Sequence, residues 1–406
     1  KDWIFEQQKL TESYIDQIPQ IVEIENKLKE RWNYPRMSLP FHRNNRYFFY
    51  KNSGLQNHSV LYYKDGLNGD EKILLDPNIL SEDGSLSVSM VSVSKDGKLL
   101  AYGISKSGSD WDEYFVKDIE TGENFVDHLK WIKFSKAYWL PDGSGFFYSR
   151  YPEPLKGDEF KNQNQFNKLY FHRVGTEQSK DSLIYEDSSN PDYGFYSWVT
   201  DDEQYQILGV WSGSNNNNLL YYKKNGSKEK FQPIIEEWIG DFRMIHNFDS
   251  EFYVQTTFNS PKGRIIKIDI NDPRQENWKN IVNENENTLH SSKVVNTNQI
   301  LITYKKDLIH NLYLHDINGK YLDEVSLPSK GSLRISANWN DSEIFYSFTS
   351  FLYPTTIFKL NLNSGLSDLY WEADINFDNN QYTVDQIFYD SKDGTQIPMF
   401  IIHNNK

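Results

Sequence analysis

The feature that most constrains the fold is a pattern that recurs seven times along the chain. Each copy has an apolar strand-like segment, a polar tip, a second apolar segment and then a turn. The copies begin 52, 47, 60, 46, 48 and 44 residues apart, at Arg46, Lys98, Gly145, Tyr205, Glu251, Gln299 and Glu343. A repeat of this length predicts one supersecondary unit per copy, and such units become stable by stacking on their neighbours.

Several copies are preceded by a shared lead-in, which places an apolar residue and an acidic turn before the strand. It is visible in SVSKDGKLLAYG, YWLPDGSGFFYS, WVTDDEQYQILGVW and ANWNDSEIFYSF. The lead-in consists of one strand and a turn that enters the next strand. Each unit should therefore contain about four antiparallel strands. Seven four-stranded units predict a mainly β fold, a seven-bladed β-propeller. Aromatic residues make up 16% of the chain, and these large side chains suit packing between blades.

The two ends of the chain follow other patterns. Apolar residues between positions 3 and 32 recur at helical spacings, and Pro19 is expected to divide this segment into two short helices. At the other end, QIFYDSKDGTQIPMFIIHNNK has two apolar runs around the turn-forming residues 391–394. This pattern predicts a β-hairpin, and a hairpin is marginally stable in water unless it packs on something else.

Composition excludes several classes of function. The net charge of −14 argues against nucleic-acid binding, which needs a basic surface. The absence of cysteine rules out disulfides and thiolate chemistry within the chain, and it fits a reducing compartment. The mean hydropathy of −0.71 argues against an integral membrane protein. The run Asn215 to Asn218 is interpreted as a solvated hairpin tip.

The chain contains no recognisable catalytic or metal-binding motif. G-x-S-x-G, H-E-x-x-H, the P-loop and G-x-G-x-x-G are all absent, and the nine histidines show no metal-ligand spacing. No catalytic residue, metal or cofactor is therefore predicted. The repeat pattern alone leaves the function open, because propellers serve as scaffolds for many activities.

Five local strings resemble the prolyl oligopeptidase family of serine peptidases, in the right order and spacing. They are SGLQN (53–57), LDPNILS (75–81), SGSDW (107–111), FTSFLYP (348–354) and FYDSKDGTQIPMF (388–400). The resemblance implies a two-domain serine endopeptidase that cleaves short peptides on the carboxyl side of proline. An α/β-hydrolase domain would carry a Ser-Asp-His triad, and the propeller would cover it and keep folded proteins out. We also expect a monomer and a cytoplasmic location.

The resemblance also implies how the chain is divided. Residues 1–33 would form a helical segment that belongs with the hydrolase domain, residues 34–384 the propeller, and residues 385–406 the first strands of the hydrolase domain. The triad would then lie outside these 406 residues, so the chain alone is expected to be inactive. The alternative is a non-catalytic, free-standing propeller that binds peptides or a protein partner. The terminal hairpin argues against this alternative, which has no use for half of a hydrolase strand pair.

Four residues are predicted to bind substrate by the same resemblance. Phe134 aligns with a pocket phenylalanine and would form an apolar wall for the residue before proline, although blade packing is the other reading of this ring. Tyr193 is followed by Gly194, where relatives often have methionine. Trp211 and Ser214 stand where mammalian-type members carry arginine and cysteine. Because Trp211 lacks the positive charge, we expect a weaker preference for acidic groups distal to the proline.

The resemblance finally implies an open ring. The first and last blades, near residues 34–64 and 343–373, would meet by side-chain packing without a shared strand. The hypothesis follows that this seam can part and admit substrate.

Overall fold

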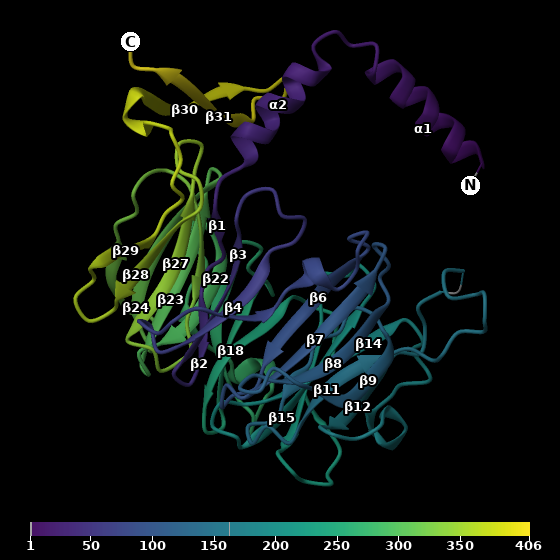
Figure 1. Cartoon of the computed structure of the whole chain (residues 1–406). Helices are drawn as coiled ribbons and strands as arrows, with labels where there is room; N and C mark the ends of the chain where they lie inside the picture. Colours follow the sequence, from purple (N-terminus) through teal and green to yellow (C-terminus); the bar gives the residue numbers. More distant parts are fainter. Residues whose placement is uncertain (1, 162) are drawn as a thin grey trace.

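The computed structural model describes residues 2–161 and 163–406, and it forms a ring of seven antiparallel β-sheets. Each sheet is one blade, and the blades follow one another in chain order around the ring (Figure 1). The seven copies of the sequence pattern coincide with the second and third long strands of the seven blades. The prediction of a seven-bladed propeller is therefore confirmed.

The first three blades cover residues 36–185. Blade 1 contains β1 (Arg36–Met37), β2 (Phe41–Arg43), β3 (Arg46–Asn52), β4 (Val60–Asp65) and β5 (Lys72–Leu75). Blade 2 contains β6 (Leu86–Val93), β7 (Leu99–Lys106), β8 (Asp112–Asp118) and β9 (Asn124–Ile132). Blade 3 contains β10 (Tyr138–Trp139), β11 (Gly145–Arg150), β12 (Lys168–Arg173) and β13 (Ser182–Tyr185).

The other four blades cover residues 193–371. Blade 4 contains β14 (Tyr193–Val199), β15 (Tyr205–Ser212), β16 (Leu219–Lys224) and β17 (Gln232–Ile235). Blade 5 contains β18 (Phe242–Phe248), β19 (Glu251–Thr256), β20 (Arg264–Asp269) and β21 (Lys279–Val282). Blade 6 contains β22 (Thr288–Val295), β23 (Gln299–Lys306), β24 (Ile309–Asp316) and β25 (Tyr321–Val325). Blade 7 contains β26 (Ser332–Ser336), β27 (Glu343–Thr349), β28 (Thr356–Asn361) and β29 (Ser367–Trp371). Single turns of 3₁₀-helix lie at Pro77–Ile79, Gln178–Lys180, Gln275–Asn277 and Asn379–Gln381.

Burial explains why the second long strand of each blade has a continuous apolar sequence. In β23 and β27, five consecutive residues are buried, because neighbouring blades cover both faces of the strand. The outermost strands are more exposed, as in β25, where four of five residues face solvent. The burial of these strands thus falls from the middle of the blade toward the rim of the ring.

Seven hydrophobic clusters hold the ring together, one at each junction between neighbouring blades. The junction of blades 7 and 1 is a seam without a chain connection between its two sheets. It contains a small buried cluster of Met37, Phe49, Phe345 and Ile357. Side-chain contacts add to it, including a 2.9 Å contact between His42 Nε2 and an Asp341 carboxylate oxygen. Within the described residues, the seam is closed by side chains, as the sequence led us to expect.

Both ends of the chain lie at one end of the ring, which we call the upper end (Figure 1). Helices α1 (Asp2–Ile15) and α2 (Ile21–Trp32) flank Pro19 and have no buried residue. Strands β30 (Tyr382–Asp390) and β31 (Gln396–Asn404) form a separate two-stranded sheet, so the predicted hairpin is present and longer than its apolar runs. In the part of the chain that the structure describes, no helix has the length and apolar character needed to cross a membrane.

The terminal hairpin touches the ring through two upper-end loops. Gln386 Nε2 donates a 2.8 Å hydrogen bond to the carbonyl oxygen of Asp307, and the ring of Phe400 lies 5.3 Å from that of Phe351. Asp307 and Phe351 each follow the second long strand of their blade. Loops at this position in the other blades therefore also lie at the upper end.

Candidate functional site

Phe134 is presented at the upper end by an unusual backbone. It lies between β9 and β10, and its φ of +57° falls in the left-handed region that bulky residues rarely adopt. The segment is anchored by Ser135, whose carbonyl oxygen accepts the Tyr114 hydroxyl at 2.7 Å and whose Oγ accepts the Ser149 amide at 2.8 Å. The Phe134 side chain is 58% exposed. Strain of this kind is typical of functional segments, and it places the ring outside the blade core.

Trp211 lies opposite Phe134, and its ring occupies the space above Gly194. Residues 194 and 211 are partners in the β14–β15 pairing. A Cβ at Gly194 would lie 2.1 Å from Trp211 Cε2, which is closer than any real contact. The rings of Trp211 and Phe134 meet edge to face, with centroids 6.1 Å apart. Glycine at 194 and tryptophan at 211, the two positions expected to depart from the family pattern, thus accommodate each other.

Tyr193 and Ser214 occupy different surroundings. Tyr193 packs against Trp238 with ring centroids 5.2 Å apart, and its hydroxyl accepts a 3.1 Å hydrogen bond from Trp238 Nε1. Because side chains alternate along a strand, Tyr193 projects to the face of β14 opposite Gly194. Ser214 lies in the exposed turn after β15. The structure brings together Phe134 and Trp211, and the substrate-binding roles of all four residues stay predictions.

A cavity of about 400 Å³ lies beside Trp211, between blades 4 and 5. Tyr196 and Trp198 line it from β14, on the same face as Gly194, and their rings stack 5.7 Å apart. Asp241 and Arg243 line its other side and form a 2.7 Å ion pair. These four residues were missed in the sequence, where they resemble ordinary blade residues. The period-two spacing of 194, 196 and 198 is the signal that could have identified Tyr196 and Trp198.

The asparagine run next to this cavity is only partly a solvated tip. Asn215 and Asn216 are exposed, but Asn218 is buried at 8% exposure. Its side chain accepts the Phe242 amide at 2.7 Å and donates to the Phe242 carbonyl at 3.0 Å. Asn217 donates to the Trp238 carbonyl at 2.7 Å. The interpretation as a solvated hairpin tip is therefore wrong for Asn217 and Asn218, which connect blade 4 to the segment that opens blade 5.

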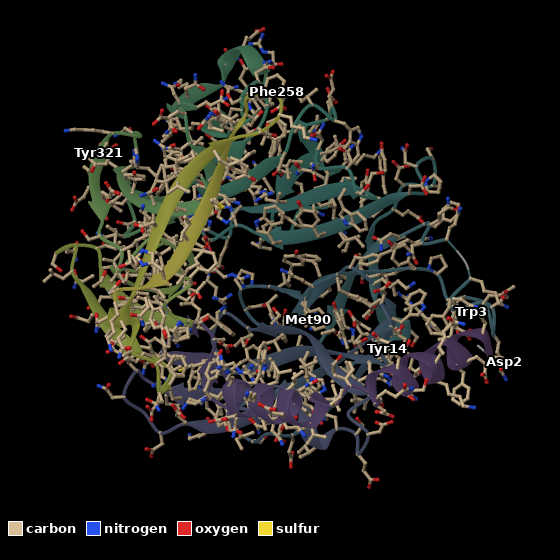
Figure 2. All side chains as sticks on the ribbon, turned by 90° about the horizontal axis from the view of Figure 1, so that it is seen from above. Asp2, Trp3, Tyr14, Met90, Phe258 and Tyr321 are labelled. Carbon is tan, nitrogen blue, oxygen red and sulfur yellow. The ribbon has the colours of Figure 1, made fainter. Side chains whose placement is uncertain are left out.

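The central channel is the second element of the candidate site. Figure 2 looks into the ring from the upper end, where the innermost strands surround the axis. A cavity of about 630 Å³ lies at the lower mouth, between blades 1, 2, 3, 4 and 7. His42 and Asp341 both line it, and the hydrogen bond between them raises the pKa of His42. The channel mouth is thus polar and carries charges of both signs.

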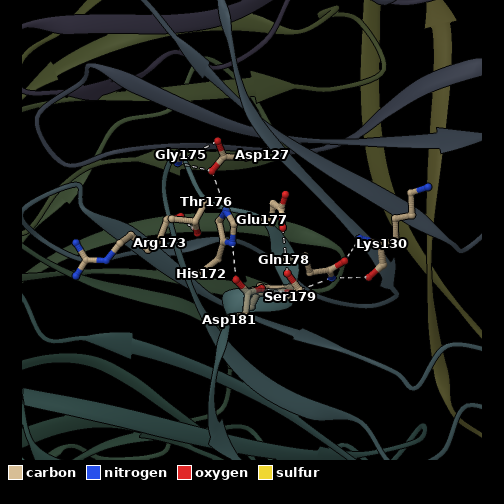
Figure 3. Close-up of polar contacts among 11 residues, drawn as sticks. Asp127, Lys130, His172, Arg173, Gly175, Thr176, Glu177, Gln178, Ser179 and Asp181 are labelled. Atoms are coloured by element: carbon tan, nitrogen blue, oxygen red, sulfur yellow. Dashed lines mark hydrogen bonds and ion pairs between the residues drawn. The ribbon is translucent and has the colours of Figure 1, made fainter.

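The most strongly perturbed histidine lies away from both sites, in a buried polar network between blades 2 and 3 (Figure 3). His172 contacts Asp127 through Nε2 at 2.7 Å and Asp181 through Nδ1 at 2.6 Å, and all three side chains are fully buried. Burial alone would lower the pKa of His172, but the two hydrogen-bonded carboxylates outweigh it and raise the pKa to about 9. None of these three residues lines the cavity beside Trp211 or the cavity at the lower channel mouth. We therefore interpret the network as structural. Within residues 2–161 and 163–406, no cluster of His, Cys, Asp or Glu has the geometry to hold a metal ion.

Comparison with known proteins identifies the architecture. The family model described as "Prolyl oligopeptidase, N-terminal beta-propeller domain" matches residues 1–373. The prolyl endopeptidase of Elizabethkingia miricola is 35% identical over 402 residues, and that of Elizabethkingia meningoseptica is 36% identical over 404. Both matches cover 99% of this chain and 56% of the relative, so the chain spans a little over half the length of these curated relatives.

Solved structures agree with the sequence comparison. A prolyl endopeptidase from a study of inter-domain dynamics in catalysis and specificity superposes with a TM-score of 0.91 at 30% identity, covering 100% of this chain and 59% of that one. Prolyl oligopeptidase B from Galerina marginata, bound to a 25mer macrocyclization substrate, superposes with a TM-score of 0.89 at 26% identity. That match covers 98% of this chain and 59% of the fungal protein.

Proposed function

The chain belongs to the prolyl oligopeptidase family, as its N-terminal β-propeller domain, and we propose that it is the substrate-filtering part of a serine endopeptidase. The longer protein would cleave short peptides on the carboxyl side of proline. Its chemistry would be acyl transfer by a Ser-Asp-His triad with an oxyanion hole, in a domain outside residues 1–406. This chain would contribute binding and exclusion, and no residue in it is assigned a step of bond cleavage.

The observation that carries the proposal is the apolar surface at the upper end of the ring. The helices and the hairpin expose large apolar side chains there, among them Trp3, Phe5, Leu28, Trp32, Phe388, Met399 and Ile402. Figure 2, seen from above, shows the helices and the hairpin on this upper face of the ring. Isolated apolar side chains are common on protein surfaces, but two elements that are exposed together indicate a surface that another domain covers.

The aromatic pair suits the proposed substrate. Phe134 and Trp211 offer an exposed edge and face for a flat apolar group such as a proline ring. The adjoining cavity of about 400 Å³ has room for a few side chains and not for a folded domain. This size fits a filter for short peptides.

The proposal is tested by sequencing the gene downstream of the codon for Lys406 and expressing the longer protein that it encodes. A blocked dipeptide that ends in proline, joined to a fluorogenic amine, should be cleaved, and a fluorophosphonate should abolish the cleavage. Residues 1–406 alone should release no fluorophore. A stop codon after Lys406, or a longer protein without cleavage, would leave a free-standing peptide-binding propeller as the function. The monomeric state and the cytoplasmic location stay predictions.

A further inference from the structure

The central channel holds two basic side chains without an acidic partner. Arg43 ends β2 in blade 1 and Lys293 lies on β22 in blade 6, and both line one cavity of about 360 Å³. Among the described residues, neither cation has a carboxylate oxygen within 4.0 Å. Arg43 Nη1 instead donates to two neutral oxygens, the His42 carbonyl at 3.1 Å and Asn338 Oδ1 at 3.2 Å.

The surroundings disfavour both charges. Burial lowers the pKa of Arg43, and it also lowers the pKa of Lys293, with repulsion from Arg43 adding to the effect. Two half-buried cations near each other are unfavourable unless an opposite charge offsets them. The two neutral oxygens accept hydrogen bonds from the Arg43 guanidinium, but they do not neutralise its positive charge.

The two acidic residues that face this part of the channel are engaged elsewhere. One Asp341 carboxylate oxygen contacts His42 Nε2 at 2.9 Å and accepts the Asn338 amide at 2.7 Å. Asp201 lies 3.4 Å from His246 Nδ1. Both acids attract Arg43 from beyond ion-pair distance. Among the described residues, Arg43 and Lys293 therefore share this cavity without a carboxylate in direct contact with either of them.

The rest of the cavity wall combines apolar and polar groups. Five apolar residues line it, Phe41, Val91, Val93, Ile335 and Ala337, together with His42 and two serines. We propose that this cavity binds a carboxylate that carries a small apolar group, such as the C-terminal residue of a short peptide. The planar guanidinium of Arg43 matches a carboxylate in shape, and Lys293 supplies a second charge. Binding at this site does not depend on peptide cleavage.

Inorganic phosphate shares the oxyanion chemistry of a carboxylate but has no apolar group to place against the valines. N-acetyl-leucine carries both features, and N-acetyl-leucinamide keeps the apolar group without the charge. These three probes therefore separate a charge-only site from the site proposed here. Arg43 and Lys293 are partly exposed to solvent, so salt screens their attraction for the carboxylate. Binding should therefore weaken as ionic strength rises.

The test is an NMR titration of residues 1–406 with each probe at pH 7 and low salt. N-acetyl-leucine should bind at least tenfold more tightly than either N-acetyl-leucinamide or phosphate. Equal binding of the amide would overturn the carboxylate site. Equal binding of phosphate would overturn its apolar part, and no binding of N-acetyl-leucine at millimolar concentration would overturn the proposal as a whole.

Substitutions locate the site. Arg43→Gln and Lys293→Met should each weaken binding of N-acetyl-leucine at least tenfold, about 1.4 kcal/mol, and leave binding of the amide unchanged. Arg274→Gln is the matched control, since Arg274 lies outside this cavity and is paired with Asp272 at 2.6 Å. Should the methionine variant fail to fold, Lys293→Arg keeps the charge and should keep the binding. Unchanged binding in both neutral variants, or an equal loss in Arg274→Gln, would contradict the assignment.

Discussion

At the scale of single residues, Gly194 and Trp211 depend on each other sterically. Gly194 and Trp211 are 17 positions apart by residue number, and the structure places the indole where a side chain at 194 would stand. A tryptophan here requires a glycine opposite, because interiors tolerate little overlap. The Trp211 ring in turn lies against Phe134 with the two ring planes nearly perpendicular, at 88°, which shapes the candidate site.

A double-mutant cycle should reveal this dependence. Gly194→Met should destabilise the protein by about 1–3 kcal/mol through overpacking. The same change in a Trp211→Ala background should cost at least about 1 kcal/mol less, since the space above the backbone is then free. Urea unfolding measures both differences. Ser214→Met, in the neighbouring exposed turn, is the control and should change stability by under about 0.5 kcal/mol. Additive effects in the cycle would contradict the pairing.

Trp211 also bears on the substrate preference of the longer enzyme that we propose. An indole offers stacking but no positive charge, and the nearby Arg243 is already paired with Asp241 at 2.7 Å. Peptides with leucine or glutamate at the position distal to proline should therefore be cleaved equally, or with leucine preferred. Trp211→Arg should shift kcat/KM toward the glutamate peptide. A clear glutamate preference of the unmodified enzyme would contradict this prediction.

His172 should make stability depend on pH. Its folded pKa of about 9 lies above the ordinary value of 6.5, so the folded state holds the proton more tightly. The resulting stabilisation, roughly 3 kcal/mol, is full below pH 6.5 and is lost as pH rises toward 9. The stability difference between the wild type and His172→Gln, measured by urea unfolding, should shrink over this range. A constant difference for His172→Gln would mean that the network is not charged.

At the scale of elements, the blades and the two ends of the chain are stabilised differently. Each blade contributes to buried clusters at its junctions. The helices have no buried residue, and the hairpin meets the ring through contacts such as those of Gln386 and Phe400. In residues 1–406, these end elements therefore add little to the cohesion of the ring.

Removal of the hairpin should test this difference. A chain that ends at Asp374 should keep a thermal midpoint within about 3 °C of the full chain, because few contacts are lost. Its binding of a hydrophobic dye should fall, since Phe388, Met399 and Ile402 are removed. A chain that ends at Gly331 also lacks blade 7 and should not fold cooperatively. A large loss of stability in the shorter deletion would show that the hairpin is part of the ring.

At the scale of the whole molecule, one junction differs from the other six. Successive blades are joined by the chain, but blades 7 and 1 meet through side chains such as His42, Arg43, Asn338 and Asp341. Thermal opening of the ring should therefore begin at this seam, since only non-covalent contacts resist it there. The seam is also the place where a wider entrance to the channel could form.

A crosslink across the seam should expose its role. Lys64→Cys and Tyr370→Cys, whose native side chains lie 5.5 Å apart from ammonium to ring centroid, can be joined by a bismaleimide because the chain has no other cysteine. The crosslink should raise the thermal midpoint and, in the longer enzyme, lower the rate of peptide cleavage. The control joins Gln204→Cys and Asp249→Cys across blades 4 and 5, where a 3.2 Å hydrogen bond links the native side chains. Full activity with the seam closed would refute gating at this junction.

The sequence by itself determined the number of blades, the second and third long strands of each blade, the two helices and the terminal hairpin. These features depend on period and turn chemistry, which are properties of residues close together in the chain. Only the tertiary structure decided that Phe134 meets Trp211, that Asn218 binds the next blade, and that Arg43 and Lys293 share one cavity. Such contacts join residues tens to hundreds of positions apart. They exist because the ring closes and brings seven similar units around one axis, and no local pattern records which side chains then face each other.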